Sequence, residues 1–192
     1  MKGRGCVLGG MSEMCKWFVF FTHTGKEHAV CNYLNGMFDD ERTVAFVPQV
    51  ELVYKNSGQT YKKLKPMFPG YVLAESVMDS TKFARKALQI VKQTTHFINL
   101  LGKENPEFMS LHEKEKEFLL NFCVNRHPHT HVVEKSIGFI EGDKLIVTSG
   151  PLCGRESIVK RIDRHKKRAE IELEFMGNLR RVNVSLEVVS KI

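Results

Sequence analysis

The segment Met67-Phe68-Pro69-Gly70-Tyr71-Val72 (MFPGYV) carries the clearest structural signal in the chain. Proline fixes φ and glycine tolerates a positive φ, so the Pro69-Gly70 pair predicts a tight turn. Aromatic side chains flank this turn, and residues 70–75 (GYVLAE) are typical of a strand. The turn is therefore expected to project Phe68 and Tyr71 at the start of a strand.

Upstream of this turn, strand and helix patterns alternate. A helix is expected from residue 25 to about residue 37, with Thr24 as its N-terminal cap. Apolar, β-branched and aromatic residues predict strands in four segments, the last two of which are expected to pair. These segments are residues 16–21, 43–47, 50–55 and 59–65.

Downstream of the turn, the same alternation continues. Asp79 or Ser80 is expected to cap a helix whose apolar residues recur at spacings of three and four. A short apolar segment follows at residues 96–101, and Ser110 with Glu113 fits the capping box of one more helix. The mixture of strands and helices predicts an α+β N-terminal domain.

The pattern changes after residue 123. No regular period survives in residues 124–136 (VNRHPHTHVVEKS), and Pro128 breaks any helix, so we expect a linker there. Residues 137–192 contain no helix signal. A small all-β barrel is favoured because closure removes exposed sheet edges. Its five expected strands are residues 144–148, 156–162, 168–175, 179–184 and 186–189.

Positive charge gathers in one window of this C-terminal region. The chain has a formal net charge of +7, and residues 155–168 contain seven Lys or Arg but only two acidic residues. The centre of the window is RHKKR, residues 164–168, where a tight hairpin would ordinarily carry Asn-Gly or Asp-Gly. This charge density favours an anionic partner; the alternative is a solvated turn that keeps the protein soluble.

Other patterns argue against a metalloprotein, a membrane protein and an enzyme. The five cysteines form no CxxC pair, and the longest apolar run, residues 17–21, is too short for a membrane span or a signal peptide, so a reduced, cytoplasmic protein is expected. His127, His129 and His131 form an HxHxH pattern without a nearby cysteine or carboxylate. Cys31 and His28 lack a third orienting group for nucleophilic catalysis. We expect no cofactor and no metal.

Three blocks of the sequence resemble those of NusG-type transcription elongation factors. Trp17-Phe18-Val19, Thr22, Gly25 and Glu27 are similar to the opening of their N-terminal (NGN) domain, and MFPGYV is similar to its most recognisable segment. A third block resembles the KOW motif. It consists of Gly142-Asp143-Lys144 to Val147, Ser149-Gly150-Pro151-Leu152, Gly154, Ile158-Val159 and Ile162-Asp163.

This resemblance implies the order of the domains. It implies a flexible tail over residues 1–15 and an NGN domain with an antiparallel sheet and helices over residues 16–123. A linker over residues 124–136 and an SH3-like KOW barrel over residues 137–192 would follow.

The resemblance also implies a non-enzymatic factor that docks on the clamp coiled coil of RNA polymerase. The family's docking surface matches Trp17, Phe68 and Tyr71, extended by Phe83. The alternative is that Trp17 and Phe68 are ordinary core residues. Thr94, Thr95 and His96 match the region where NGN domains can approach the non-template DNA strand; a plain polar loop is the alternative. A monomer that does not bind membranes is expected.

Among specialised paralogues, the chain is most similar to LoaP, an antiterminator that recognises an RNA hairpin in the nascent leader; the UpxY and RfaH types compete with it. Leu152 and Phe175-Met176 depart from the apolar residues with which the general factor binds Rho or a ribosomal protein. Phosphate is then the expected partner of the basic residues. These are Arg155, Lys160, Arg161, Arg164, His165, Lys166, Lys167, Arg168 and Arg180.

Three alternatives stay open at this point. The basic residues can form one surface or two, because a meander places the RHKKR turn and the turn at residues 176–178 at opposite ends of the barrel. The chain can be a general NusG-like factor without specific RNA recognition. It can also be a ribosome-associated KOW protein, which would have no need of the MFPGYV segment.

Overall fold

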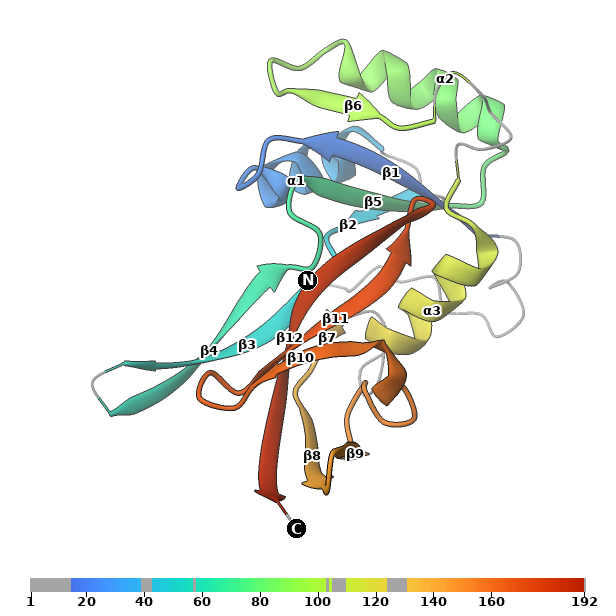
Figure 1. Cartoon of the computed structure of the whole chain (residues 1–192). Coiled ribbons are helices and arrows are strands. Elements are labelled where there is room, and N and C mark those ends of the chain that lie inside the picture. The colour runs from blue at the N-terminus through green and yellow to red at the C-terminus, as the bar shows by residue number, and fades with distance from the viewer. Residues whose placement is uncertain are drawn as a thin grey trace. The chain divides into compact units, whose positions relative to one another are not determined.

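The computed structural model describes residues 15–38, 43–56, 58–102, 104, 110–123 and 131–191. Their backbone forms two compact units, which are described separately (Figure 1): one lies within Met1–Val47 and Pro69–Lys116, the other within Pro48–Phe68 and Glu117–Ile192. The expected tail except Cys15, the first part of the expected linker, and both His127 and His129 lie outside the described residues.

The first unit is an α+β fold built on a four-stranded antiparallel sheet. Its strand order is β2-β5-β1-β6, and two helices, α1 and α2, pack against it. The elements are β1 Lys16–Thr22, α1 Glu27–Met37, β2 Thr43–Phe46, β5 Tyr71–Ser76, α2 Ser80–Val91 and β6 Ile98–Leu100. The expected strands and both helices are therefore confirmed, with boundaries shifted by a few residues.

One face of this sheet forms the core of the unit. Alternation along β1 points Phe18 and Phe20 to the same side, where they meet apolar residues of α1 and α2. Phe83 of α2 stacks on Phe18 with ring centroids 3.7 Å apart. Burying such aromatic rings contributes about 1.5–3 kcal/mol each. The residues that α1 and α2 contribute include Val30, Leu34, Ala87 and Ile90.

One of the three expected helix caps is confirmed. The Asp79 carboxylate accepts the Thr81 and Lys82 N–H groups at 2.9 and 3.4 Å. Thr24 does not cap α1, whose N-cap is Lys26 without a side-chain hydrogen bond. The capping box at Ser110 is also wrong, since α3 is Glu113–Cys123.

The start of α3 is held by a residue further along the chain. The Glu115 carboxylate accepts the His112 N–H at 3.2 Å, which is the glutamate half of a capping box displaced by two residues. Ser110 instead forms a β-bridge with Phe18. This bridge holds the Ser110 backbone in an extended conformation, and α3 begins three residues later, at Glu113.

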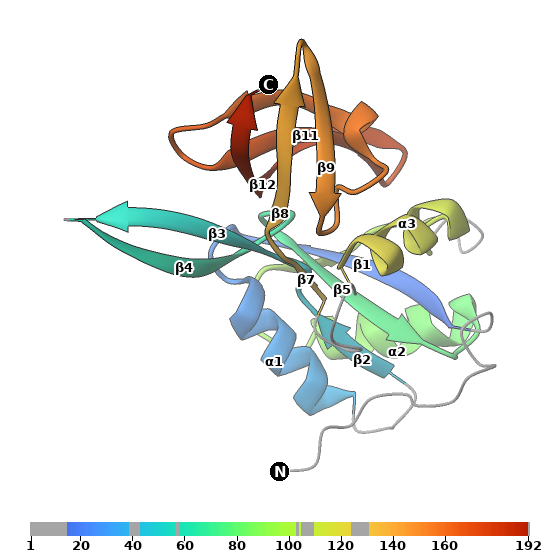
Figure 2. The same cartoon turned by 90° about the horizontal axis from the view of Figure 1, so that it is seen from below.

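The second unit is mostly β and contains a five-stranded sheet. Its strand order is β10-β11-β12-β8-β9, with β12 parallel to β8 and the other pairs antiparallel. The elements are β8 Ser136–Glu141, β9 Lys144–Ser149, the 3-10 turn Glu156–Ile158, β10 Val159–Asp163, β11 Arg168–Phe175 and β12 Asn178–Lys191. Figure 2 shows β8 and β9 side by side.

Three details of this sheet differ from expectation. The first three residues of the strand expected at 156–162 form the 3-10 turn Glu156–Ile158, and β10 begins at Val159. Strand β8 was not predicted, and the two strands expected at residues 179–184 and 186–189 are the single strand β12. Within the described residues, the edge strands β9 and β10 do not pair with each other, so the sheet is open there and barrel closure stays a prediction.

A three-stranded sheet, β4-β3-β7, completes the second unit. Strands β3 Gln49–Asn56 and β4 Gln59–Pro66 form the expected hairpin, and β7 Val132–Val133, in the expected linker, runs parallel to β3. The Ser185 hydroxyl donates to the Glu51 carbonyl at 2.6 Å, and Phe68 stacks on Phe175 at 3.9 Å. The hairpin, expected in the first domain, thus packs with the C-terminal strands.

Among the described helices, none has the length and the apolar composition that crossing a membrane requires.

Candidate nucleic-acid interface

The RHKKR turn is held in one conformation by its own backbone. Asp163 and Arg168 are paired at the end of β10 and β11, so four residues form the loop between them. The Asp163 carboxylate accepts the Lys166 N–H at 2.9 Å, and the Lys167 N–H donates to the Arg164 carbonyl at 3.2 Å. Lys167 closes the loop with φ of 51°, a left-handed conformation. The cations are therefore carried on a preformed turn.

Four of the five turn side chains face solvent, and two of these four form ion pairs with acidic residues. Arg164, His165, Lys166 and Lys167 are exposed. The Lys166 ammonium lies 3.5 Å from the Asp163 carboxylate. Lys167 forms an ion pair with Glu187, which also binds Lys135 at 2.7 Å. The turn is thus strongly but not uniformly positive.

The carboxyl group of Glu187 is locked in its charged form. Hydrogen bonds from Lys135 and Lys167 lower the pKa of Glu187 from 4.5 to about 2. A carboxyl group whose pKa is lower in the folded chain than in the unfolded chain stabilises the fold at any pH above its unfolded pKa. This contribution is lost as the pH falls towards 2. Because these groups are partly exposed, we expect it to be at most about 1 kcal/mol.

Replacing Glu187 should therefore change how the free energy of unfolding depends on pH at acidic pH. We expect Glu187→Gln to unfold more easily than the unaltered chain at pH 7, with the difference shrinking between about pH 4.5 and pH 2. Urea unfolding across that range measures it, with Glu174→Gln at an exposed position of β11 as the control. A difference that stays constant with pH would contradict the ion-pair explanation.

Arg168, the fifth residue of the turn, lies partly buried against the β3–β4 hairpin. Its guanidinium sits 4.6 Å from the ring centroid of Tyr54, close enough for a cation–π interaction. Its Nε is buried and has no hydrogen-bond acceptor among the described residues. Lys65 lies over the same ring at 5.6 Å. The hairpin therefore orders the end of the turn.

A groove of about 470 Å³ lies between this turn and the hairpin. It is lined from the hairpin by Val53, Tyr54, Lys55 and Thr60, and from the turn by His165, Lys166, Lys167 and Arg168. Figure 1 shows the hairpin extending beside the β10–β11 turn. The sequence did not reveal this wall, because about a hundred residues separate it from the turn.

The other expected basic residues are divided among different partners. Lys160 pairs with Glu172 at 3.6 Å, and Arg155 donates to the Pro151 carbonyl at 3.0 Å. Arg161 and Arg180 are exposed. Arg180 pairs with Leu173, five residues along β11 from Arg168, so about 17 Å of strand separates it from the turn. The RHKKR turn and the Met176-Gly177 turn thus lie at opposite ends of β11, as the meander predicted.

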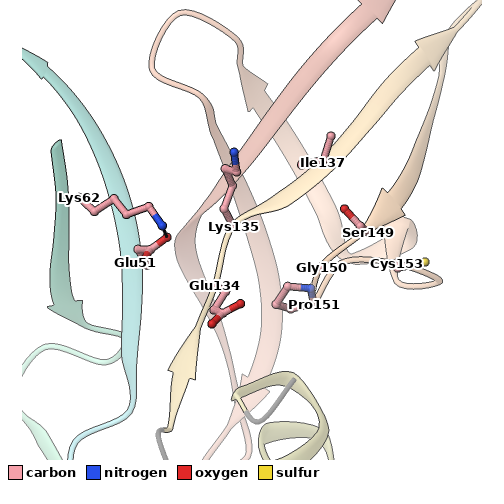
Figure 3. A pocket seen from close by; sticks show the side chains of 9 residues that line it. All are labelled: Glu51, Lys62, Glu134, Lys135, Ile137, Ser149, Gly150, Pro151 and Cys153. Atoms are coloured by element: carbon pink, nitrogen blue, oxygen red, sulfur yellow. Dashed lines mark ion pairs between the residues drawn. The ribbon is translucent and has the colours of Figure 1, made fainter. Parts of the chain in front are cut away.

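A second groove, of about 550 Å³, is also lined by the hairpin, through Glu51 and Lys62 (Figure 3). Its charges are mixed, since Glu51 pairs with Lys62 at 3.0 Å and Glu134 and Lys135 line it as well. Gly150 in its wall has φ of 93°, and a Cβ there would lie 2.6 Å from the Ser136 Cα, so only glycine fits. This balanced groove adds no net attraction for an anion.

Three of the four side chains expected to dock on polymerase are buried, Trp17 and Phe83 in the first unit and Phe68 in the second. Trp17 is 1%, Phe83 0% and Phe68 4% exposed, which agrees with the alternative that such aromatics are core residues. Tyr71 is partly exposed and meets Phe21 edge-on at 5.4 Å. A docking role for these residues stays a prediction. Of the four, Tyr71 is the one whose side chain is exposed enough to contact polymerase directly.

Tyr71 belongs to an aromatic patch that the sequence did not reveal. Phe21 contacts Phe97 at 6.2 Å, Phe97 contacts His23 at 4.8 Å, and Phe97 is 50% exposed. We call Phe21, His23, Tyr71 and Phe97 the aromatic patch. Strand pairing between Phe21 and Tyr71 places them on the same sheet face, a signal that needs the register and not only the composition.

The Pro69-Gly70 turn next to this patch is fastened by a buried carboxylate. Glu27, 2% exposed, accepts the Gly70 N–H at 2.7 Å and the Gly25 N–H at 2.8 Å. The Thr22 N–H donates to the Gly70 carbonyl at 2.8 Å. Gly70 has φ of 86°, and a Cβ there would lie 3.0 Å from the Thr22 oxygen. Glu27 therefore positions the turn that precedes Tyr71.

Removing this carboxylate should destabilise the first unit. Glu27→Ala leaves two N–H groups without their acceptor, so we expect a loss of about 2–4 kcal/mol in unfolding free energy. Glu27→Gln retains one acceptor oxygen and should lose about half as much. Urea unfolding of the full chain measures both variants, and equal stability of Glu27→Ala and the unaltered protein would contradict this role.

Among the residues that the structure describes, the remaining candidate sites do not bring together catalytic or metal-binding groups. Burial raises the pKa of the Cys31 thiol to about 11, and the thiol donates to the Ala45 carbonyl at 3.3 Å, which disfavours a nucleophilic thiolate. No cluster of three metal-binding side chains occurs among the described residues, which include His131. Thr95 and His96 are exposed, and the His96 N–H donates to the Thr94 hydroxyl at 3.0 Å.

Comparison with known proteins identifies the family. The family model "NusG: Transcription termination factor nusG" matches residues 15–118, more than half of the chain. The chain belongs to the NusG family. This is a family of transcription factors that are not enzymes.

Individual NusG proteins are similar along nearly their whole length. The transcription termination/antitermination protein NusG of Buchnera aphidicola is 22% identical, with 94% of this chain and 98% of that protein covered. NusG of Escherichia coli K12 is 23% identical and NusG of Yersinia pestis 25%, each over 94% of this chain and 99% of the relative. A solved structure described as "Domain interaction in Thermotoga maritima NusG" aligns with a TM-score of 0.49 at 19% identity, covering 94% of this chain and 96% of that one.

Proposed function

We propose that this NusG-family protein is a processive antiterminator, which binds RNA polymerase through its first unit and a structured nascent RNA hairpin through the RHKKR turn. The observation that carries the proposal is the preformed turn, which presents four exposed cationic or titratable side chains on a fixed backbone. Preplaced cations lose little conformational entropy when they meet phosphates. RNA duplexes are read mainly through backbone and shape.

The proposal of a specialised paralogue of the LoaP type rests on a different feature. Leu152 and Phe175 stand where the general factor is expected to expose apolar residues for Rho or a ribosomal protein. Both are fully buried here, and Phe175 stacks on Phe68. Buried side chains cannot serve as contacts without a rearrangement. A general NusG-like factor therefore fits less well.

We further infer that residues 137–192 form a KOW-type module, following an NGN domain at residues 16–123 and a linker at residues 124–136. The five-stranded sheet and the glycine-dependent turn at Gly150 support this inference. On the polymerase side, the aromatic patch supports docking, and the exposed turn at Thr95 and His96 supports an approach to non-template DNA. The protein would act in the cytoplasm as a monomer.

Sequencing of RNA cross-linked to the full chain in its host tests this function. We expect the cross-links to gather at one or a few leader hairpins upstream of a terminator. Purified polymerase should then read through that terminator when the protein is added, and only when the hairpin is present. Uniform cross-linking along all transcripts would favour a general elongation factor, and co-purification with ribosomal subunits in place of polymerase would favour the ribosome-associated alternative.

A further inference from the structure

The β3–β4 hairpin carries a pair of tyrosines that the RNA-binding proposal does not yet use. Tyr54 and Tyr61 are cross-strand partners whose rings are nearly parallel, at 17°, with centroids 5.6 Å apart. Tyr54 is partly buried, whereas Tyr61 is 48% exposed. An exposed aromatic ring offers a flat face on which a nucleic-acid base can stack.

The two tyrosine rings are linked by contacts to the cationic turn. The Arg168 guanidinium lies 4.6 Å from the Tyr54 ring, which in turn faces Tyr61. Arg168, Tyr54 and Tyr61 thus form a connected series from the cationic turn to the outer surface of β4. The pKa of Tyr54 is lowered, first by a hydrogen bond with Lys65 and also by the charge of Arg168, which indicates a positive environment around this ring.

Cations accompany the exposed ring along its strand. Alternation of side chains places Tyr61, Lys63 and Lys65 on the same face of β4, and Lys63 and Lys65 are exposed. The groove at the edge of the hairpin opens onto Lys166 and Lys167 of the turn. An aromatic platform flanked by a row of cations is the arrangement by which proteins bind single-stranded nucleic acid.

We propose that the hairpin and the turn form one composite site for a junction in RNA, where the turn binds duplex phosphates and an unpaired base beside the duplex stacks on Tyr61. This inference rests on the proposed RNA-binding function and extends its ligand from a duplex to a duplex with a single-stranded flank. Bases inside a duplex are already stacked on each other, so only an unpaired base can cover the ring of Tyr61. Lys63 and Lys65 would meet the phosphates of the unpaired strand.

Three fluorescent RNA probes test the inference with the full-length protein. The first is a blunt hairpin whose ten-base-pair stem is taken from the cross-linked leader RNA and whose four-nucleotide loop is abasic, so that no loop base can stack. The second carries five adenosines at each end of this hairpin, and the third carries five abasic nucleotides at each end. The abasic flanks keep the phosphates but remove the bases. We expect the adenosine-flanked probe to bind about tenfold more tightly than the abasic probe, since stacking of one base is worth about 5- to 150-fold in affinity.

Variants on β4 separate stacking from other effects. Tyr61→Ala should bind the adenosine-flanked and the abasic probes equally, and Tyr61→Phe should restore the tenfold difference, because the ring and not the hydroxyl provides the platform. Leu64→Ala is the matched control, since Leu64 is also 48% exposed on β4 but lies on the opposite face. It should bind all three probes as the unaltered protein does.

The outcomes distinguish this inference from the function on which it rests. If the unaltered protein binds all three probes equally well, RNA binding stands and the stacking site is overturned. If it binds none of them, the RNA-binding function itself fails. If Leu64→Ala lowers affinity as much as Tyr61→Ala, the loss reflects the hairpin in general, and the assignment to Tyr61 is overturned.

Discussion

Replacing Arg164, Lys166, Lys167 and Arg168 together by glutamine should abolish measurable binding of the full-length protein to its RNA hairpin. If each of the four side chains meets one phosphate, binding should weaken with salt at a log–log slope of about −3 to −4. The slope should fall towards the shallow end of this range, because Lys167 already pairs with Glu187 and Arg168 is held over Tyr54. The quadruple variant should lose most of this slope, as fluorescence anisotropy over a salt series would show.

A charge-matched variant controls for the loss of net charge. Lys26, Lys82, Arg85 and Lys92 are exposed cations of the first unit, and replacing these four by glutamine removes the same formal charge far along the chain from the turn. This variant should bind RNA nearly as well as the unaltered protein. Should the quadruple turn variant bind normally while Arg155→Ala or Arg180→Ala does not, the RNA site would lie at the other end of β11.

Single substitutions in the turn should separate phosphate contacts from base contacts. Arg164 is exposed, and its planar guanidinium can pair with guanine, so Arg164→Lys should cost roughly 1–3 kcal/mol at one RNA position. Arg168 was an equal candidate from its residue type, but its guanidinium already covers Tyr54. Lys166→Arg should change affinity little for every RNA, because an exposed lysine meets phosphate without strict direction.

Local patterns predicted the strands and helices of this protein well, because alternation and apolar spacing act over neighbouring residues. The N-termini of the three helices show the limit of prediction from local patterns. Asp79 caps α2 through residues two and three positions away, and the sequence found it. The N-cap of α1, Lys26, makes no side-chain hydrogen bond. Glu27, the first residue of this helix, accepts the N–H of Gly70, 43 residues further along, a pairing that no local pattern contains.

The candidate site was predicted only in its local part. The cationic turn is a continuous run of residues, and its position between β10 and β11 was predicted correctly. Its second wall comes from β3, which packs beside β12 through contacts such as Ser185 to Glu51. The burial of Phe68 and Trp17 could not be read either, since aromatic residues serve both cores and interfaces.

Polymerase binding should respond very differently to changes at Phe68 and at Tyr71. Phe68 is buried and stacked on Phe175, so Phe68→Ala should lower the unfolding free energy by about 3–5 kcal/mol, and any loss of polymerase binding would follow from unfolding. Tyr71 is partly exposed beside Phe21. Tyr71→Ala should leave the protein folded and weaken polymerase binding by at least about 2 kcal/mol, the loss typical of an aromatic hot spot.

Thermal melts and polymerase pull-downs on the same preparations separate the two effects. Phe97→Ala should behave like Tyr71→Ala, because Phe97 is the most exposed apolar ring of the aromatic patch. Tyr61→Ala removes a ring of similar exposure from the β3–β4 hairpin and should leave polymerase binding unchanged. Normal polymerase affinity in folded Tyr71→Ala and Phe97→Ala would exclude the aromatic patch as the docking surface. Docking would then require Phe68 or Trp17 to leave the core. A variant in which Phe68 is held against Phe175 should in that case fail to bind polymerase.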